Sequence, residues 1–541
     1  MPQQSALSRF RPSPVELLCL IAGVLLVWRF AWLMDDSYVY FRYVDNLVIR
    51  EVGLVWNEGE FVEGFSSPFW AMLLVVLRRL HADFWMVVRV AGVLSFAVFW
   101  WLAVLVNRGL TSEGARGRLA FNLPLVYLSL CYGVLCYFTS GLESPLVLVS
   151  AGVFGCAVLW PERRSLQVVM GIAPLVRPEL TVPFVLWLLI VSIRKRRLPV
   201  AAIVSAVVAV GGYLVFRVWY YADVFPNTFH LKDELWVVQG LQYLWDTLGP
   251  YRTLPFGIVL AALFAVLRRG QGHARTYGPE RLTMLALALP VAAYVVKVGG
   301  APIHFKDLAF PFALSMLAGG GLLEGVGARW EGWRRVAAVV LTLALGASVL
   351  TMHPRQLPRM PLRQHNAFGH KIVAMISDAA YHRAPAMGLV PGRGAGANAL
   401  SYAFAERRYG GSREKAAVQT DSWCRTSYMR PSTLVVHSRG LTEPFLARTP
   451  VHSDRPAHKF GLEQLAEDIA RVRRAQGFRA GAFDDALEAG KGEEWMRRNI
   501  ESIRSIERRV YNEHGFFANL GMALSSPEVI EVEEPETGQV E

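Results

Sequence analysis

The chain has few cysteines for its length, five in 541 residues. Cys19, Cys131, Cys136 and Cys156 lie within apolar runs and only Cys424 lies outside one, so no disulfide framework is indicated. No group of histidines and cysteines has the spacing of a zinc site, and no glycine-rich phosphate loop is present. These absences exclude a disulfide-stabilised secreted domain, a zinc module and a cytoplasmic nucleotide-binding fold.

Apolar residues, by contrast, are abundant. They make up 53% of the chain, and the mean hydropathy is +0.30. Runs such as Val15–Leu33, Pro199–Tyr220 and Val336–Met352 are long enough to cross a bilayer. The first run ends in Asp-Asp with no small-residue cleavage site after it, so it does not read as a removable signal peptide. The sequence predicts a polytopic α-helical protein of the plasma (inner) membrane.

The net charge of +12 is divided among short basic clusters between the apolar runs. Three of these clusters lie at 161–164, 194–197 and 268–275. Cytoplasmic loops of membrane proteins are enriched in Lys and Arg, so the clusters mark the cytoplasmic loops rather than a nucleic-acid surface. The loops between them are then predicted to be extracytoplasmic.

The sequence predicts about eleven crossings. Each crossing normally needs about 20 apolar residues. Pro68–Leu80, Met86–Val106 and Phe121–Phe138 give three candidates between two outer loops, where an even number is required. Pro68–Leu80 is the shortest, so we expect it to be a partly embedded or re-entrant element. Residues 1–352 are predicted to form the membrane domain, with 34–67 as its first outer loop.

The character of the chain changes after Met352. Residues 353–525 are predicted to form a soluble extracytoplasmic α/β domain, of ordinary domain size. An expected strand at 432–438 and an expected helix at 461–475 support this class. The acidic end at 526–541 is predicted to be a disordered tail.

Polar side chains gather in the loops assigned to the outer face. Each one taken alone has a structural explanation, such as a helix end or a turn. Together they combine carboxylates, which can deprotonate a hydroxyl, with cations, which can hold a phosphate. That combination suits glycosyl transfer from a lipid-linked sugar phosphate. The candidates are Asp35, Asp36, Arg42, Glu143, Arg177, Glu179, Asn227, His230, Lys232, His304, Lys306 and Asp307.

The stretch 35–74, "DDSYVYFRYVDNLVIREVGLVWNEGEFVEGFSSPFWAMLL", resembles the first extracytoplasmic loop of polyprenyl-phosphate-dependent glycosyltransferases of the GT-C superfamily. More narrowly, it is similar to the terminal β-(1→2) arabinofuranosyltransferase family. Further matching elements follow in order: "SGLESPL" (140–146), "RPE" (177–179), "PNTFHLK" (226–232), "GLTEPFLAR" (440–448) and "RPAHK" (455–459).

The resemblance implies transfer of a sugar, a pentofuranose such as arabinofuranose, from a polyprenyl phosphate to an envelope glycan or glycoconjugate. It gives the general-base role to Asp35 or Asp36, without distinguishing them, and adds His458 to the cations near the phosphate. One departure puts the donor sugar in question: in the loop at 299–311, Ala301 replaces an acid of the family and Lys306 an arginine, with Asp307 next to it. No metal ligand is assigned, although a divalent cation between carboxylates and phosphate is compatible with this chemistry.

Two other functions stay open. A transporter of lipid-linked intermediates would also have many spans and intramembrane charges, but it would not need a large outer domain, and no pair of matching repeats is visible. The second alternative is that the protein is a non-catalytic subunit of envelope assembly. The altered loop at 299–311 is the best argument for this function.

Overall fold

The computed structural model describes residues 12–80, 83–111, 122–231, 235–248, 253–269, 277–300, 305–323, 418–421, 424, 428, 433–438, 440–450, 462–525 and 529–531. Statements about structure below concern these residues. The predicted span Val336–Met352, the boundary at 352/353 and the tail at 526–528 and 532–541 lie outside them.

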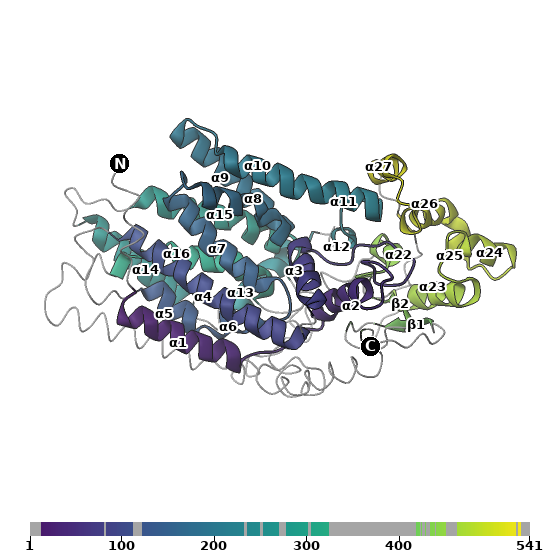
Figure 1. Cartoon of the computed structure of the whole chain (residues 1–541), viewed down its shortest axis with the longest axis horizontal. Coiled ribbons are helices and arrows are strands. Elements are labelled where there is room, and N and C mark those ends of the chain that lie inside the picture. The colour runs from purple at the N-terminus through teal and green to yellow at the C-terminus, as the bar shows by residue number, and fades with distance from the viewer. Residues whose placement is uncertain are drawn as a thin grey trace.

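The described part before residue 324 is helical, with its helices side by side in an elongated bundle (Figure 1). The helices are α1 (Pro14–Arg29), α2 (Ser37–Val48), α3 (Pro68–Arg79), α4 (Phe84–Leu110), α5 (Leu123–Leu130), α6 (Tyr132–Leu135), α7 (Ser144–Leu159), α8 (Arg164–Val176), α9 (Thr181–Lys195), α10 (Val200–Ala206), α11 (Gly212–Tyr221), α12 (Asn227–His230), α13 (Val237–Leu248), α14 (Thr253–Arg269), α15 (Gly278–Lys297) and α16 (Ala309–Leu317).

Three described helices are long and apolar enough to cross a membrane: Phe84–Leu110, Val200–Tyr221 and Gly278–Lys297. The second consists of α10 and α11 joined by a π-helical segment, Val207–Gly211. A fourth candidate is a pair of helices, Gly133–Thr139 and Ser144–Leu159, bent by 120°. The expectation of a helical membrane protein with several spans is therefore confirmed, while the predicted number of crossings stays a prediction.

The candidate crossing at Phe121–Phe138 is not one continuous helix over the described residues 122–138, and its place in the membrane stays a prediction. α5 ends at Leu130, Cys131 has an extended backbone, and two short helical segments follow, ending at Thr139. Hydropathy records apolar content and does not register a change of backbone direction. The prediction at Met86–Val106, in contrast, falls inside α4.

The start of α1 shows how local sequence and packing agree. Ser13 accepts a hydrogen bond from the Glu16 amide at 3.2 Å, the Glu16 carboxylate accepts one from the Ser13 amide at 2.8 Å, and Pro14 occupies the first turn. This is a capping box, which satisfies amides that the first helical turn leaves without partners. Glu16 is fully buried and also pairs with Arg108 of α4 at 2.9 Å, which ties α1 to α4.

The described part of the tail gathers at one end of the bundle (Figure 1). It contains a parallel pair of strands, β1 (Val418–Asp421) and β2 (Leu434–His437), in the register Val418 to Leu434. Its helices are α22 (Pro444–Ala447), α23 (Glu463–Gln476), α24 (Ala482–Glu488), α25 (Glu494–Arg498), α26 (Ile500–Val510) and α27 (Phe516–Leu524). β2 and α23 match the strand and helix predicted at 432–438 and 461–475.

The tail and the segment 34–67, which the sequence predicts to be the first outer loop, pack as one structure. Asn57 donates to the Val435 carbonyl at 3.0 Å and accepts from the Val435 amide at 2.9 Å. Arg42 is buried and donates to the carbonyls of Trp56 at 2.8 Å and Thr433 at 2.6 Å. Strand β2 is thus fastened to the loop by side chains that lie far away in the sequence.

A buried charge cluster completes this interface. Arg473 of α23 is 1% exposed and contacts two carboxylates, Glu443 at 2.6 Å and Glu60 at 2.8 Å. Asn57 donates to Glu60 at 2.7 Å, and the Tyr511 hydroxyl donates to it at 3.1 Å. Two acids share one guanidinium, and burial raises the pKa of Glu443 to about 7 although Arg473 opposes the rise. We call Glu60, Glu443 and Arg473 the buried triad.

Candidate active site

The turn that precedes α2 is held by tight packing. The Met34 amide donates to the Ser140 carbonyl at 2.9 Å, so the chain at 34–37 lies against the turn at 140–143. Gly141 in that turn has φ +83°, and a Cβ there would lie 2.6 Å from the Ser37 Cβ, so only glycine fits. This contact places Asp36 and Glu143 in the lining of one cavity.

The cavity has a volume of about 580 Å³ and is lined by both apolar and charged side chains. The apolar lining includes side chains that are partly exposed at the surface of the bundle, namely Val182, Leu214, Phe225 and Phe229. The ionisable side chains of the lining are Asp36, Glu143, Glu179, Asp307, Arg177, Arg217, Lys306, Tyr40 and Tyr213. The cavity therefore suits a ligand that has both an anionic and an apolar part.

Arg177 contacts three of the carboxylates that line the cavity. It ends α8, and its guanidinium contacts Glu143 at 2.6 Å, Glu179 at 2.7 Å and Asp307 at 3.3 Å. Burial would lower the pKa of Arg177, but the three carboxylates outweigh burial and hold it well above its usual value. Arg177 is a permanent cation in this site.

Lys306 provides the second cation. It begins a short 3₁₀ helix, Lys306–Leu308, after Phe305, whose φ is +70°. Its ammonium pairs with Asp36 at 2.9 Å. Burial alone would lower the pKa of Lys306, but the charges of Asp36 and Asp307 more than offset burial, so the pKa lies above its usual value. This pair joins the segment 34–67 to the segment 299–311, where the sequence departs from the pattern of the glycosyltransferases that it resembles.

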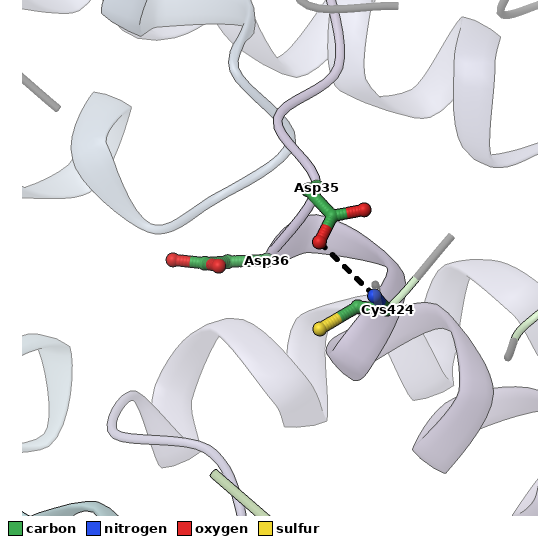
Figure 2. Close-up of side chains that lie close together, drawn as sticks. All are labelled: Asp35, Asp36 and Cys424. Atoms are coloured by element: carbon green, nitrogen blue, oxygen red, sulfur yellow. Dashed lines mark hydrogen bonds between the residues drawn. The ribbon is translucent and has the colours of Figure 1, made fainter. Parts of the chain in front are cut away.

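Asp35 and Asp36 are adjacent in the sequence but point in different directions (Figure 2). Asp36 lines the cavity, whereas Asp35 is not among its lining residues and accepts a hydrogen bond from the Cys424 amide at 3.0 Å. Asp35 therefore fastens the tail to the membrane part. Of these two aspartates, only Asp36 presents its carboxylate to the cavity.

Within the described residues, one group offers three potential metal ligands in close proximity. The ligand atoms of Asp35, Asp36 and Cys424 all lie within 4.8 Å of one another (Figure 2). Carboxylate oxygens suit hard cations such as Mg²⁺ or Mn²⁺, whereas a thiol suits softer ones. The Cys424 sulfur also lies 3.5 Å from His437 Nε2. This mixed donor set gives no clear preference for one metal.

The predicted site residues divide into three groups. Asp36, Glu143, Arg177, Glu179 and Lys306 come together at the cavity, and Asp307 joins them. Four others lie elsewhere: Asp35 and Arg42 as described above, Asn227 and His230 as described below. Lys232, His304 and His458 lie outside the described residues.

Asn227 and His230 flank the cavity without lining it. The Asn227 amide group donates to the carbonyls of Gly440 at 2.9 Å and Leu441 at 3.1 Å, which holds the tail against α12. His230 lies 3.5 Å from Asp223, which also pairs with Arg448 of the tail at 2.8 Å. Between them, Thr228 and Phe229 do line the cavity.

Among the ionisable cavity residues, sequence reasoning missed three: Tyr40, Tyr213 and Arg217. Tyr40 donates to Glu143 at 3.0 Å and accepts from the Ser67 amide at 3.1 Å, so it fixes the carboxylate that faces Arg177. Arg217 lies in α11 and contacts Glu63 at 2.5 Å. An arginine within a spanning run is a recognisable functional signal, so Arg217 could have been found. Tyr40 stands among other aromatics and gives no such signal.

Comparison with known proteins gives two curated relatives and one solved structure. The terminal β-(1→2)-arabinofuranosyltransferase of Corynebacterium glutamicum is 27% identical over 380 residues, covering 61% of this chain and 53% of the relative. The enzyme of the same name from Mycobacterium tuberculosis is 30% identical over 325 residues, covering 52% of this chain and 51% of the relative. The chain is similar to terminal β-(1→2)-arabinofuranosyltransferases. The resemblance inferred from the first outer loop is thereby confirmed.

The chain spans about half the length of the curated arabinofuranosyltransferases it matches. No family model matches it. Among solved structures, ArnT from Cupriavidus metallidurans bound to undecaprenyl phosphate is 14% identical with a TM-score of 0.45, covering 79% of this chain and 86% of that one.

Proposed function

We propose that this protein is an integral-membrane glycosyltransferase that takes a sugar from a polyprenyl-phosphate donor and transfers it to a cell-envelope glycan or glycoconjugate. The observation that carries this proposal is the cavity lined by both apolar and charged side chains. A lipid-linked sugar phosphate combines the same two kinds of group, an apolar chain and a phosphodiester. The sequence similarity to arabinofuranosyltransferases supports a pentofuranose such as arabinofuranose as the sugar.

In this proposal Asp36 is the general base. The acceptor hydroxyl oxygen attacks C1 of the sugar, its proton passes to the Asp36 carboxylate, and the bond between C1 and the phosphate oxygen breaks. Polyprenyl phosphate leaves as the anion, and its charge is held by Arg177 and Lys306. Glu143, fixed by Tyr40 and Arg177, orients the acceptor or stabilises positive charge on the ring.

Ion pairing in the cavity implies an order of events. Lys306 already pairs with Asp36, and Arg177 with three acids. A donor phosphate that contacts Lys306 competes with Asp36 for it. A carboxylate that loses a cationic partner becomes a stronger base, so donor binding would make Asp36 ready for the acceptor proton.

Membranes that contain the protein should be supplied with radiolabelled polyprenyl-phospho-sugars and a glycan acceptor, and product counted for each donor. Asp36→Asn keeps the shape of the side chain but removes its basicity, so it should lower the rate about 100-fold or more. Asp35→Asn should lower it much less. Asp83→Asn is a matched control, because Asp83 caps α4 through its side chain and asparagine caps helices equally well.

Full activity of Asp36→Asn would refute the assignment of the base. Absence of transfer from every donor tested, with the protein inserted and folded, would instead favour the non-catalytic assembly role or lipid transport. The cell membrane as the site of action, and an outward-facing cavity and tail, are part of this proposal.

A further inference from the structure

Helix α27 presents apolar side chains to its surroundings. Its sequence, FFANLGMAL, has no charged residue. Phe517 is 85% exposed and Leu524 is 71% exposed. Large apolar side chains exposed together in this way mark a surface that binds a partner or a membrane.

The helix is fastened to one end of a membrane-spanning segment. Asn519 of α27 donates to the Trp219 carbonyl at 2.7 Å, and Asn512, just before α27, donates to the Tyr220 carbonyl at 3.3 Å. The ring of His514 stacks on Tyr220 with a centroid distance of 5.1 Å and an interplanar angle of 5°. The carbonyls in the last turn of a helix have no partners within the helix, so these contacts complete the end of the span Val200–Tyr221.

Helix α27 adjoins the end of the span. Figure 1 shows α27 beside the end of α11, and the two helices are in contact. On α11, Val215 is 56% exposed and Trp219 is 40% exposed. Trp219 lies near the end of the span, and tryptophan is enriched where spans meet the membrane–water interface. Phe517 and Leu524 therefore belong to a helix that adjoins a candidate membrane span with exposed apolar side chains of its own.

We infer that α27 lies in the membrane–water interface, with Phe517 and Leu524 among the lipid acyl chains, and that it anchors the tail to the bilayer. A nine-residue helix is too short to span but long enough to lie along the surface. A lipid surface is favoured over a protein partner because the patch adjoins a spanning helix. The inference holds whether or not the protein is a transferase.

The test uses the full chain in lipid nanodiscs with a bimane label at one introduced cysteine. Phe517→Cys and Leu524→Cys place the label on α27, and Glu501→Cys places it on α26, at a side chain that is 79% exposed. The five native cysteines are all buried, so the unsubstituted protein gives the labelling background. All three positions are exposed, and gel filtration checks that each variant is folded.

Phospholipids brominated near the start of the acyl chains should quench the label at positions 517 and 524 and not at 501, because interfacial helices sit about 5–10 Å into the headgroup and acyl boundary. Aqueous iodide should give the reverse order. Labels on α27 that iodide quenches as strongly as at 501 would overturn the inference. Labels shielded from both quenchers would also overturn it, since a protein partner or a second copy would then cover the helix.

Discussion

Replacing Glu443 with glutamine removes one acid of the buried triad while keeping its shape and one of its hydrogen-bonding oxygens. The pKa of Glu443 rises from 4.5 to about 7, with burial as the main cause. The native protein thus binds a proton in a pH range where the unfolded chain has released it. The contribution of Glu443 to stability is full below about pH 4.5 and is lost as the pH rises through about 7. Over this range the free energy of unfolding falls by about 3 kcal/mol, because one pKa unit corresponds to about 1.4 kcal/mol.

Glutamine cannot titrate, so Glu443→Gln should lose this pH dependence. Cys424 is buried in the tail, and its alkylation, followed by mass spectrometry, reports transient opening there. The labelling rate of the parent divided by that of the variant cancels the intrinsic pH dependence of the thiol. This ratio should rise roughly 100-fold between pH 5 and pH 8. Glu467→Gln, at a half-exposed glutamate on α23, is the control and should not alter the pH dependence. A ratio that stays flat for Glu443→Gln would refute the reasoning.

Asn227→Ala removes the hydrogen bonds to the carbonyls of Gly440 and Leu441. Because each buried carbonyl left without a partner costs about 1–3 kcal/mol, Cys424 should be alkylated at least about 10-fold faster in this variant. An unchanged rate would show that Asn227 does not hold the tail. The topology is tested in intact cells: an impermeant thiol reagent should label a cysteine substituted for Phe225 and spare one substituted for Lys195 until the cells are opened, since basic residues at 194–197 mark the cytoplasmic side. The opposite pattern would place the cavity in the cytoplasm.

Sequence reasoning located the cavity acids and bases because membrane proteins restrict where charge can lie. Glu143, Arg177, Glu179 and Lys306 each follow or precede an apolar run, and the ends of neighbouring spans lie at one level of the membrane. Their convergence could therefore be predicted without knowledge of the helix packing. The similarity of the first loop to arabinofuranosyltransferases added the predicted roles of the acids.

The directions of side chains and their long-range partners could not be predicted from the sequence. Asp35 and Asp36 cannot be separated by hydropathy, yet one contacts the Cys424 amide and the other faces the cavity. Arg42 carries the chemistry of a phosphate ligand, but its guanidinium is used by the carbonyls of Trp56 and Thr433. Such partners are set by the packing of the tail on the loop, which no local pattern encodes.

The fastening of the first loop to β2 has a consequence for biosynthesis. The Arg42 partner Thr433 lies 391 residues further along the chain, and the Asn57 partner Val435 lies 378 residues further. At about 5–20 residues per second, a ribosome needs roughly 20–80 s to make that distance. During this interval Arg42 and Asn57 lack those partners, and Asp35 lacks the Cys424 amide. The nascent membrane part must therefore wait with an unfinished loop, and a chain that stops before β2 would never form these contacts between loop and tail.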